Sequence, residues 1–444
     1  MDVLVLVDGE HYPPVTRWGI QAARTLGHRV VGALFVGGSE KIGAEGLPDL
    51  GVPCVAADGS LGPSLAQQLD RFRPEAVLDL SDEPVLGYAE RMEVAAVTLA
   101  RGVPYLGADF RLDPPIYGPA LPAATVAVIG TGKRTGKTSV SAEAARVAVE
   151  LGLRPVIVAM GRGGPPEPQV AEAGTVFLDS LLARAARGEH AASDYLEDAL
   201  FTGVTTVGAR RCGGGLAGAP FVTNVREAAE AALELGAGVV ILEGSGASIP
   251  PVPWDAGILV VPAALPPEHL GGYLGPFRLL LSDLVVVTMA SGPKSGPEDL
   301  TTLRSHVWRF REDARFVATD FQPVPLEDIR GKAVYVATTA PGDKAATQVA
   351  SMQAKYGCRV VGWSSHLADR SVLARELESA GDYEVLLTEL KAAAVDVAAR
   401  AARERGAGVA FLENRPVDAE DPPRLRGLLE ETFRLASSRH EERA

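Results

Sequence analysis

The chain has 444 residues, 47% of them hydrophobic, and a mean hydropathy of +0.11. This composition supplies large apolar cores and argues against a disordered chain. The net charge of −13 argues against a general binder of nucleic acid or membrane surfaces, so a site for anions needs a local concentration of basic groups.

The cysteines and the N-terminus restrict the class further. Cys54, Cys212 and Cys358 lie far apart with no CxxC pair, so neither a zinc site nor a disulfide framework is indicated. The opening MDVLVLVDGE is typical of a buried strand and not of a signal peptide. Since no apolar run approaches the roughly 20 residues of a membrane span, we expect a cytoplasmic protein without a membrane partner.

The first block alternates short β-branched runs with helical segments, a pattern typical of parallel α/β sheets. Its end is marked by a proline-rich stretch at 113–122, which we expect to be a linker. Asp8, Glu10 and His11 follow the first strand and could bind substrate or a metal, although an Asp-Gly turn explains them equally well. A Rossmann glycine fingerprint is absent, so dinucleotide binding is not expected.

The second block opens with a strand at 125–130, a glycine loop and a helix expected over 137–151. In the loop, GTGKRTGKT (130–138), five residues separate Gly130 from Gly136, where the usual phosphate loop has four. Backbone N–H groups and the helix N-terminus would surround phosphate oxygens, with Lys137 on the β- and γ-phosphates and Thr138 on Mg²⁺. The residues expected to bind nucleotide are Gly130, Thr131, Gly132, Lys133, Arg134, Thr135, Gly136, Lys137, Thr138 and Ser139.

Acidic and basic residues follow later strands of the same block. Glu243 ends a strand expected at 238–243, where open α/β sheets place ligands, and is a candidate Mg²⁺ ligand with Thr138 and Glu167. The stretch 285–293 lacks the aspartate typical of guanine recognition, which favours ATP. The basic residues exceed what ATP and Mg²⁺ require, so a strongly anionic co-substrate is expected to contact Arg162, Gly163, Arg210 and Arg211.

The third block follows a turn-rich stretch at 321–331 and again alternates strands and helices. Lys391, at the junction of a strand and a helix expected over 391–405, is either a substrate ligand or a surface lysine. The last eight residues are expected to form a frayed tail. The expected fold is α/β with three-layer parallel sheets, in which a central P-loop NTPase-like domain (119–325) lies between Rossmann-like units at 1–118 and 326–444.

Several motifs together resemble a known family. GTGKRTGKT with LEGSGASIPPV (242–252) resembles dethiobiotin synthetase and related nucleotide-binding proteins. With VDGEHYPPVT, VAMGRGGPPEP, GARRCGGGLAG and LLTELKAAAVD, the set resembles the cyclic 2,3-diphosphoglycerate synthetase family over essentially the whole chain. The resemblance implies an enzyme that uses ATP and Mg²⁺ to close 2,3-diphosphoglycerate into its cyclic phosphoanhydride, releasing ADP and phosphate.

In that hypothesis Lys133, Arg134 and Lys137 are the catalytic residues, facing the γ-phosphate and its acceptor. Enzymes of this kind are commonly symmetric, so a homodimer is expected. Two alternatives stay open. One is another ATP-dependent kinase for a small anion, or a ligase like dethiobiotin synthetase. The other is a nucleotide-driven switch protein, which would hydrolyse ATP slowly and respond to a protein partner.

Overall fold

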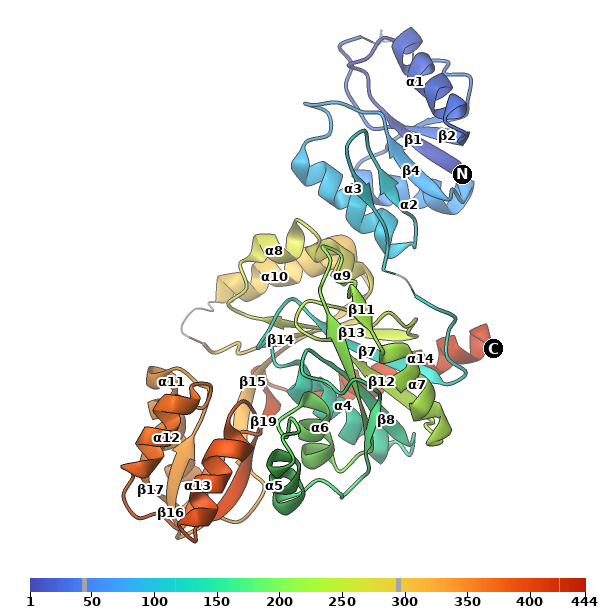
Figure 1. Ribbon diagram of the computed structural model, residues 1–444. Coiled ribbons are helices and arrows are strands. Elements are labelled where there is room, and N and C mark those ends of the chain that lie inside the picture. The colour runs from blue at the N-terminus through green and yellow to red at the C-terminus, as the bar shows by residue number, and fades with distance from the viewer. Residues whose placement is uncertain (42–45, 116, 293–296, 423) are drawn as a thin grey trace.

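The computed structural model describes residues 1–41, 46–115, 117–292, 297–422 and 424–444 (Figure 1). Three α/β units follow one another along the chain, and an irregular segment between Leu112 and Ala124 joins the first two. This segment contains the proline-rich linker predicted at 113–122, of which Ile116 lies outside the described residues. The structure confirms an α/β fold with mostly parallel sheets, while the domain boundaries at 118/119 and 325/326 stay a prediction.

The N-terminal unit is a six-stranded sheet in the order β3-β2-β1-β4-β5-β6, parallel except for the β5–β6 pair. Its central strand is buried from Val3 to Val7 because helices or loops cover both faces, as expected for a parallel sheet. The elements of this unit are β1 (Asp2–Val7), α1 (Pro13–Thr25), β2 (Arg29–Phe35), β3 (Cys54–Ala56), α2 (Leu61–Phe72), β4 (Ala76–Asp79), α3 (Tyr88–Ala100), β5 (Tyr105–Leu106) and β6 (Arg111–Leu112).

The central unit carries the glycine loop in the middle of its sheet, between β7 and α4. Its elements are β7 (Ala124–Gly130), α4 (Lys137–Glu150), β8 (Pro155–Gly161), β9 (Gln169–Ala171), α5 (Leu178–Ala186), α6 (Asp194–Thr202), β10 (Thr206–Cys212), β11 (Val222–Thr223), α7 (Val225–Glu234), β12 (Val239–Glu243), β13 (Ala256–Pro262), α8 (Pro267–Gly271), α9 (Gly275–Leu280), β14 (Leu284–Thr288), α10 (Pro297–Phe310) and β15 (Arg315–Pro325).

The C-terminal unit does not have a separate sheet. Its strands continue the central sheet through an antiparallel β15–β19 pair, which gives 13 strands in the described chain with the main order β11-β10-β8-β12-β7-β13-β14-β15-β19-β18-β16-β17. Its elements are β16 (Ala333–Ala337), α11 (Gly342–Tyr356), β17 (Arg359–Ser364), α12 (Arg370–Glu378), β18 (Val385–Thr388), a π-helix η1 (Ala394–Ala399), α13 (Arg400–Glu404), β19 (Gly408–Asp418) and α14 (Leu425–Arg443).

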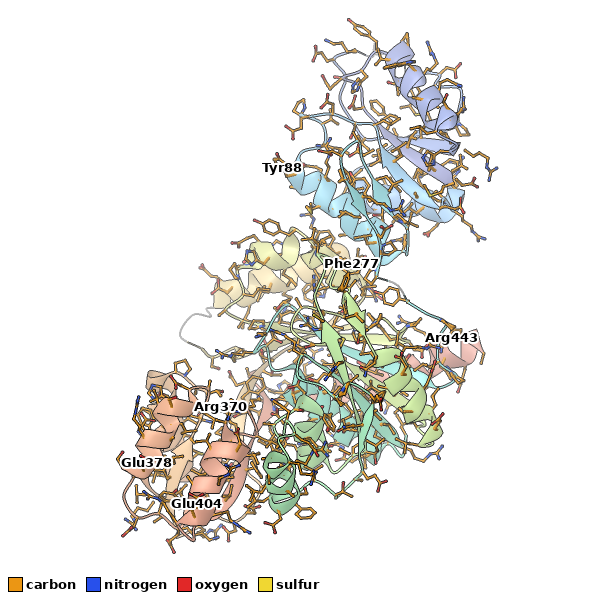
Figure 2. All side chains as sticks on the ribbon, in the orientation of Figure 1. Tyr88, Phe277, Arg370, Glu378, Glu404 and Arg443 are labelled. Atoms are coloured by element: carbon orange, nitrogen blue, oxygen red, sulfur yellow. The ribbon has the colours of Figure 1, made fainter. Side chains whose placement is uncertain are left out.

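Alternation along β7 divides the apolar side chains between two cores. Val126 and Val128 pack with α4 and α14 on one face of the sheet. Ala127 and Ile129 belong to the core on the other face, which includes α7, α9 and α10. The N-terminal unit rests on that second face, where α3 packs against α9 and Phe277 is fully buried (Figure 2). The glycine loop therefore lies at the carboxyl edge of a sheet that is covered on both sides.

Two expectations about local structure, for the stretch 321–331 and for the C-terminal tail, were wrong, and a third was right only in part. The stretch 321–331, expected to be a turn-rich separator, supplies the end of β15 up to Pro325. Two prolines fit there because this part of the strand pairs only with β19 and needs no second ladder of hydrogen bonds. The helix expected over 391–405 is present at 394–404, but its first part, Ala394–Ala399, is a π-helix that continues into α13.

The C-terminal tail expected to fray is the last part of α14. Phe433 and Ala436 are buried against the central sheet. Beyond them, the Arg439 guanidinium contacts both carboxylate oxygens of Asp283, at 2.9 and 3.0 Å, and Arg443 lies 3.1 Å from Asp255. These tertiary ion pairs keep the last turns helical. Among the described helices, none combines the length and the apolar character that a membrane span requires.

Candidate active site

The glycine loop leaves little room around its backbone. A Cβ atom at Gly130 would lie 2.9 Å from both Lys137 Cδ and Thr135 Oγ1. Gly136 has a φ of 93°, and a Cβ there would lie 2.2 Å from the Phe321 ring. Because only glycine fits at both ends, the loop turns tightly over the first turn of α4, whose free N–H groups make an anion site.

Lys137 is held over this loop as a buried cation. Its Nζ donates to the Gly132 carbonyl at 2.7 Å and to Thr135 Oγ1 at 3.3 Å. Burial lowers the pKa of Lys137 to about 8, although Glu243 and Asp194 oppose the change. No carboxylate of the described residues forms an ion pair with Lys137, so an anion bound at the loop would stabilise its charge.

Thr138 and Glu243, two predicted metal ligands, meet in the structure. Thr138 Oγ1, in the first turn of α4, donates to Glu243 Oε1 at 2.8 Å, at the carboxyl end of β12. Glu243 is only 3% exposed, and within the described chain its Oε2 has no hydrogen-bond partner. Burial is the main cause that raises the pKa of Glu243, and the charge of Asp194 adds to it. A cation beside Glu243 would offset both effects.

Three acidic residues of α6 complete this region and were missed in the sequence. Asp194 is the first residue of the helix, and Glu197 and Asp198 are buried one turn later. Neither carboxylate oxygen of Asp198 has a hydrogen-bond donor in the described part of the chain, and Asp198 lies close enough to Glu243 for the two carboxyls to share a proton. Burial, and then the charge of Glu243, raises its pKa well above the ordinary value. The signal was SDYLED (193–198), in which three acids follow a serine at a helix start.

None of the described contacts joins Glu167 to this carboxylate group. It is exposed on the loop between β8 and β9. Asp194 is exposed too, but its charge acts on both Glu243 and Lys137. The structure therefore brings Thr138 and Glu243 together with Asp194. Metal binding by Glu167 stays a prediction.

Three basic side chains, two from loops and one from β10, converge on Gly246, which follows β12. A Cβ at Gly246 would lie 3.1 Å from Arg162 Nη2, 3.3 Å from Arg211 Nη2 and 3.8 Å from Lys133 Cγ. Gly246 also has a φ of 60°, which favours glycine. We call Lys133, Arg162 and Arg211 the anion cluster; the sequence selected all three, but not the glycine on which they converge.

The charge of the anion cluster is not balanced by acids. Arg211 donates to the Gly213 carbonyl at 2.6 Å and the Ser245 carbonyl at 2.9 Å, while its buried Nε has no acceptor among the described residues. Burial is the main cause that lowers the pKa of Arg211, and the charge of Arg162 adds to it. In the described part of the molecule, no carboxylate forms an ion pair with any member of the cluster, so a bound anion would relieve the repulsion.

The other predicted basic residues are placed differently. The Arg210 Nε donates to the Gly164 carbonyl at 3.0 Å, so Arg210 braces the turn after β8. A Cβ at Gly163 in that turn would lie 3.8 Å from the His190 ring. Arg134 is exposed beside Lys133 with a φ of 57°, a left-handed conformation that is rare for arginine.

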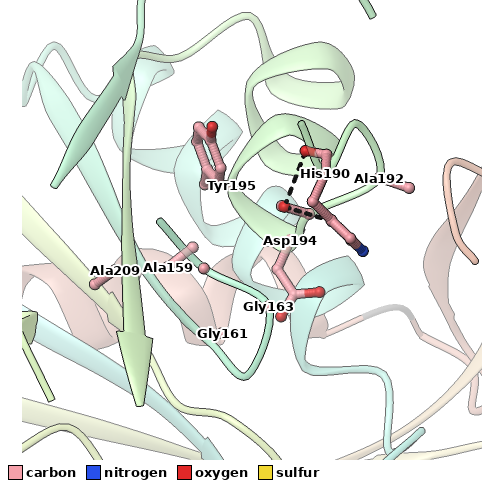
Figure 3. Close-up of a pocket in the computed structure, with 10 residues that line it drawn as sticks. Ala159, Gly161, Gly163, His190, Ala192, Asp194, Tyr195 and Ala209 are labelled. Carbon is pink, nitrogen blue, oxygen red and sulfur yellow. Dashed lines mark hydrogen bonds between the residues drawn. The ribbon is translucent and has the colours of Figure 1, made fainter. Parts of the chain in front are cut away.

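A cavity of about 100 Å³ opens between the turn after β8 and the start of α6 (Figure 3). Asp194 points toward this turn, and its Oδ2 would lie 3.5 Å from a Cβ at Gly161. The His190 Nδ1 lies 2.7 Å from Ser193 Oγ, at the residue before α6. The cavity therefore places a carboxylate and an imidazole next to a glycine-rich backbone.

Asp8, Glu10 and His11 lie at the carboxyl end of β1, in the N-terminal unit. Asp8 is buried and accepts hydrogen bonds from the backbone N–H groups of Glu10, His11 and Asp82 and a contact from His11 Nδ1 at 2.8 Å. No described contact joins these residues to the glycine loop. Their prediction as substrate ligands stays untested.

Lys391 reaches the central unit from the C-terminal unit. Its Nζ lies 3.3 Å from Glu197 Oε1 on α6, and the charge of Glu197 raises the pKa of Lys391. Burial raises the pKa of Glu197, which Lys391 opposes. The distance supports a charged pair, so Lys391 is not a free surface lysine.

Comparison with known families assigns all three units to one group. Family models match residues 2–113, 125–319 and 325–415, and are described as the N-terminal, P-loop and C-terminal domains of cyclic 2,3-diphosphoglycerate synthetase. Among solved structures, LpxK from Aquifex aeolicus in complex with ATP is 15% identical, covers 78% of this chain and 96% of its own, and has a TM-score of 0.43.

Curated relatives agree over nearly their whole length. The cyclic 2,3-diphosphoglycerate synthetase of Rubrobacter xylanophilus is 47% identical, with 94% of each chain covered. The enzyme of the same name from Methanothermobacter thermautotrophicus is 42% identical, covering 94% of this chain and 92% of its own, and that from Methanothermus fervidus is 41% identical, covering 94% and 93%. The chain therefore belongs to the cyclic 2,3-diphosphoglycerate synthetase family and is a P-loop enzyme.

Proposed function

We propose that this enzyme uses ATP and Mg²⁺ to close 2,3-diphosphoglycerate into its cyclic phosphoanhydride, releasing ADP and phosphate. The observation that carries the proposal is the anion cluster. Lys133, Arg162 and Arg211 converge on Gly246 without a described acidic partner, and Lys133 belongs to the glycine loop itself. The relatives' shared name supplies the substrate class.

The substrate fits the charge of this region. 2,3-Diphosphoglycerate carries two phosphates and a carboxylate, and forming an anhydride requires two phosphates to approach despite their repulsion. Fixed guanidinium and ammonium groups offset that repulsion, and they do so more strongly where water is excluded. Arg210 and Gly163 would shape the neighbouring turn, and Lys133 and Arg134 would lie near the γ-phosphate.

The reaction then takes two displacements. With Lys137 on the β- and γ-phosphates, an oxygen of one substrate phosphate attacks the γ-phosphorus and the bond to ADP breaks. An oxygen of the second substrate phosphate next attacks the phosphorus of the first. The ring closes, and the transferred group leaves as inorganic phosphate with one oxygen from the substrate. Positioning and charge stabilisation supply the catalysis, so no covalent enzyme intermediate is needed.

The oxygen-rich group at the end of β12 fits Mg²⁺, which prefers oxygen ligands. Glu243 has an unpaired oxygen beside the Thr138 hydroxyl, and Asp194 adds a second carboxylate. Held by these residues, Mg²⁺ would offset the negative charge of the phosphates. Asp194→Asn and Glu167→Gln separate the two candidates for the further ligand. We expect the first variant to raise the Mg²⁺ concentration for half-maximal rate by about 10-fold and the second to leave it unchanged.

The test is ADP release with and without 2,3-diphosphoglycerate, with phosphorus NMR of the product. We expect stimulation by that compound and the resonances of a cyclic phosphoanhydride. With ¹⁸O on the three terminal oxygens of the γ-phosphate, free phosphate should contain all three labels and one oxygen from the substrate. No stimulation would overturn the proposal, an uncyclised phosphorylated product would indicate a kinase, and hydrolysis without the substrate would indicate a switch protein.

Two further expectations belong to the same proposal. A homodimer, expected from the symmetry common among such enzymes, is tested by light scattering coupled to size-exclusion chromatography. Substrate contact by Asp8, Glu10 or His11 would require the N-terminal unit to approach the glycine loop. Crosslinking between these two regions in the presence of ATP and 2,3-diphosphoglycerate tests that approach.

A further inference from the structure

Lys391 makes a charged contact at one end of a large apolar interface. The C-terminal unit packs on α5 and α6 through one core, to which Leu181 and Leu196 contribute from the central unit and Leu390 and Val395 from the C-terminal unit. Lys391 immediately follows Leu390, and its Nζ lies 3.3 Å from Glu197 Oε1. The ion pair therefore joins the interface to the helix that begins with Asp194.

The backbone around Lys391 is held in an uncommon conformation. Ala392 has a φ of 50°, a left-handed value that costs energy for a residue with a Cβ, and the π-helix η1 begins two residues later. The preceding Glu389 is buried, and it accepts hydrogen bonds from Thr338 Oγ1 and Thr339 Oγ1, each at 2.7 Å. A strained backbone persists only where surrounding contacts hold it in place, and here the hydrogen bonds to Glu389 do so.

The pair acts on a helix turn crowded with negative charge. Asp194 and Glu197 are three residues apart on α6 and so lie on the same side of the helix. Asp198 and Glu243 are buried nearby, where the charge of Asp194 acts on Glu243 and the charge of Glu243 acts on Asp198. Among the described lysines, Lys137 and Lys391 are the two whose charges act on this group. Its removal would leave Glu197 buried among acids with no compensating cation.

We propose that Lys391 is a positioning residue. Its ion pair with Glu197 holds the first turn of α6 against the glycine loop. The position of Asp194 therefore depends on how the C-terminal unit packs against the central unit. The part concerning Asp194 rests on the proposed function, in which Asp194 helps to hold Mg²⁺. The ion pair and its effect on α6 do not depend on that function.

The first test uses the full-length protein without nucleotide. Hydrogen exchange of the backbone amides at 194–198 should be about 10-fold faster in Lys391→Met than in the unmodified protein, because the turn loses its anchor. Lys391→Arg, which keeps the charge, should exchange at nearly the original rate. Lys332→Met is the matched control, since Lys332 is an exposed lysine of the same unit. Unchanged exchange in Lys391→Met would overturn the proposal, even if the enzyme proved to have a different substrate.

The second test is kinetic. Lys391→Met should raise the Mg²⁺ concentration for half-maximal rate about 10-fold while leaving the KM for 2,3-diphosphoglycerate within about 2-fold. Glu197→Gln should have a similar effect, and Lys391→Met/Glu197→Gln should be no worse than Lys391→Met alone, because both changes break one interaction. The proposal would be overturned if Lys391→Met raised the KM for 2,3-diphosphoglycerate but left the Mg²⁺ dependence and the hydrogen exchange unchanged. Lys391 would then be a substrate ligand.

Discussion

The carboxyl edges of the two parallel sheets look alike in sequence but differ in how their polar groups are satisfied. At the end of β1, Asp8 accepts hydrogen bonds from three backbone N–H groups and a contact from His11. At the end of β12, Glu243 keeps an oxygen without a described partner, and Arg162 and Arg211 lie near each other without described acids. Acidic residues after a strand therefore do not by themselves mark a site. Buried polar groups without a partner in the protein mark a site more clearly, because a ligand that binds them lowers the free energy.

The largest expected effect comes from the buried cation of the glycine loop. Lys137→Met should lower kcat/KM about 10³-fold, because the transferred phosphoryl group loses a fixed positive charge. The measurement is steady-state ADP release with 2,3-diphosphoglycerate present. Lys332→Met, at an exposed lysine, serves as control. A loss below about 10-fold would mean that Lys137 does not stabilise the transition state.

Gly246 tests whether the anion cluster depends on close approach to its backbone. Gly246→Ala should raise the KM for 2,3-diphosphoglycerate about 10²-fold, since the new Cβ would lie 3.1 Å from Arg162 Nη2 and 3.3 Å from Arg211 Nη2. Gly236→Ala is the matched control. Gly236 also has a positive φ, of 78°, but a Cβ there meets nothing within 4 Å, so this variant should lose stability without a change in KM. Equal effects on KM would show that backbone strain, and not the cluster, is responsible.

Lys137→Met, which should lower activity, should raise the stability of the ligand-free protein. Burial lowers the pKa of Lys137 to about 8 from 10.5, so below pH 8 the native state carries a costly charge that the unfolded chain solvates freely. Lys137→Met should therefore be more stable by about 2 kcal/mol at pH 7 in urea unfolding.

The advantage of Lys137→Met should shrink between pH 8 and 10.5. Over that range the unfolded state of the unmodified protein binds more protons than the native state, so its stability rises with pH. A difference between the two proteins that stays constant over this range would contradict the assignment of the cost to the buried ammonium.

The smallest effect is expected at the satisfied edge. Asp8→Asn should destabilise the N-terminal unit by about 1 kcal/mol, because an amide accepts fewer hydrogen bonds than a carboxylate, and should leave kcat/KM within about 3-fold. Thermal unfolding and steady-state kinetics measure the two effects. A raised KM for 2,3-diphosphoglycerate would instead support the prediction that Asp8 contacts substrate.

The strand–loop–helix context of the site could be predicted from the chain because its determinants are local. Glycines, a lysine and a threonine at close spacing define the glycine loop, and the apolar run before it defines β7. The sequence could not predict the π-helix after Lys391 or the extension of β15 to Pro325, since both depend on neighbours distant in sequence. Proline-rich residues form a turn in isolation but a strand where β19 supplies a partner on one side.

The sequence by itself determined the α/β class, the glycine loop and the family, because these rest on periodicity and on motifs of a few residues. Only the tertiary structure decided which charges meet. It placed Asp194 where its charge acts on Glu243, and it brought Arg162 and Arg211 to Gly246. It also turned Lys391 from an isolated lysine into the partner of Glu197. The physical reason is that electrostatic interactions depend on distance and burial, and residues far apart in the chain acquire both only when the sheet brings their strand ends together.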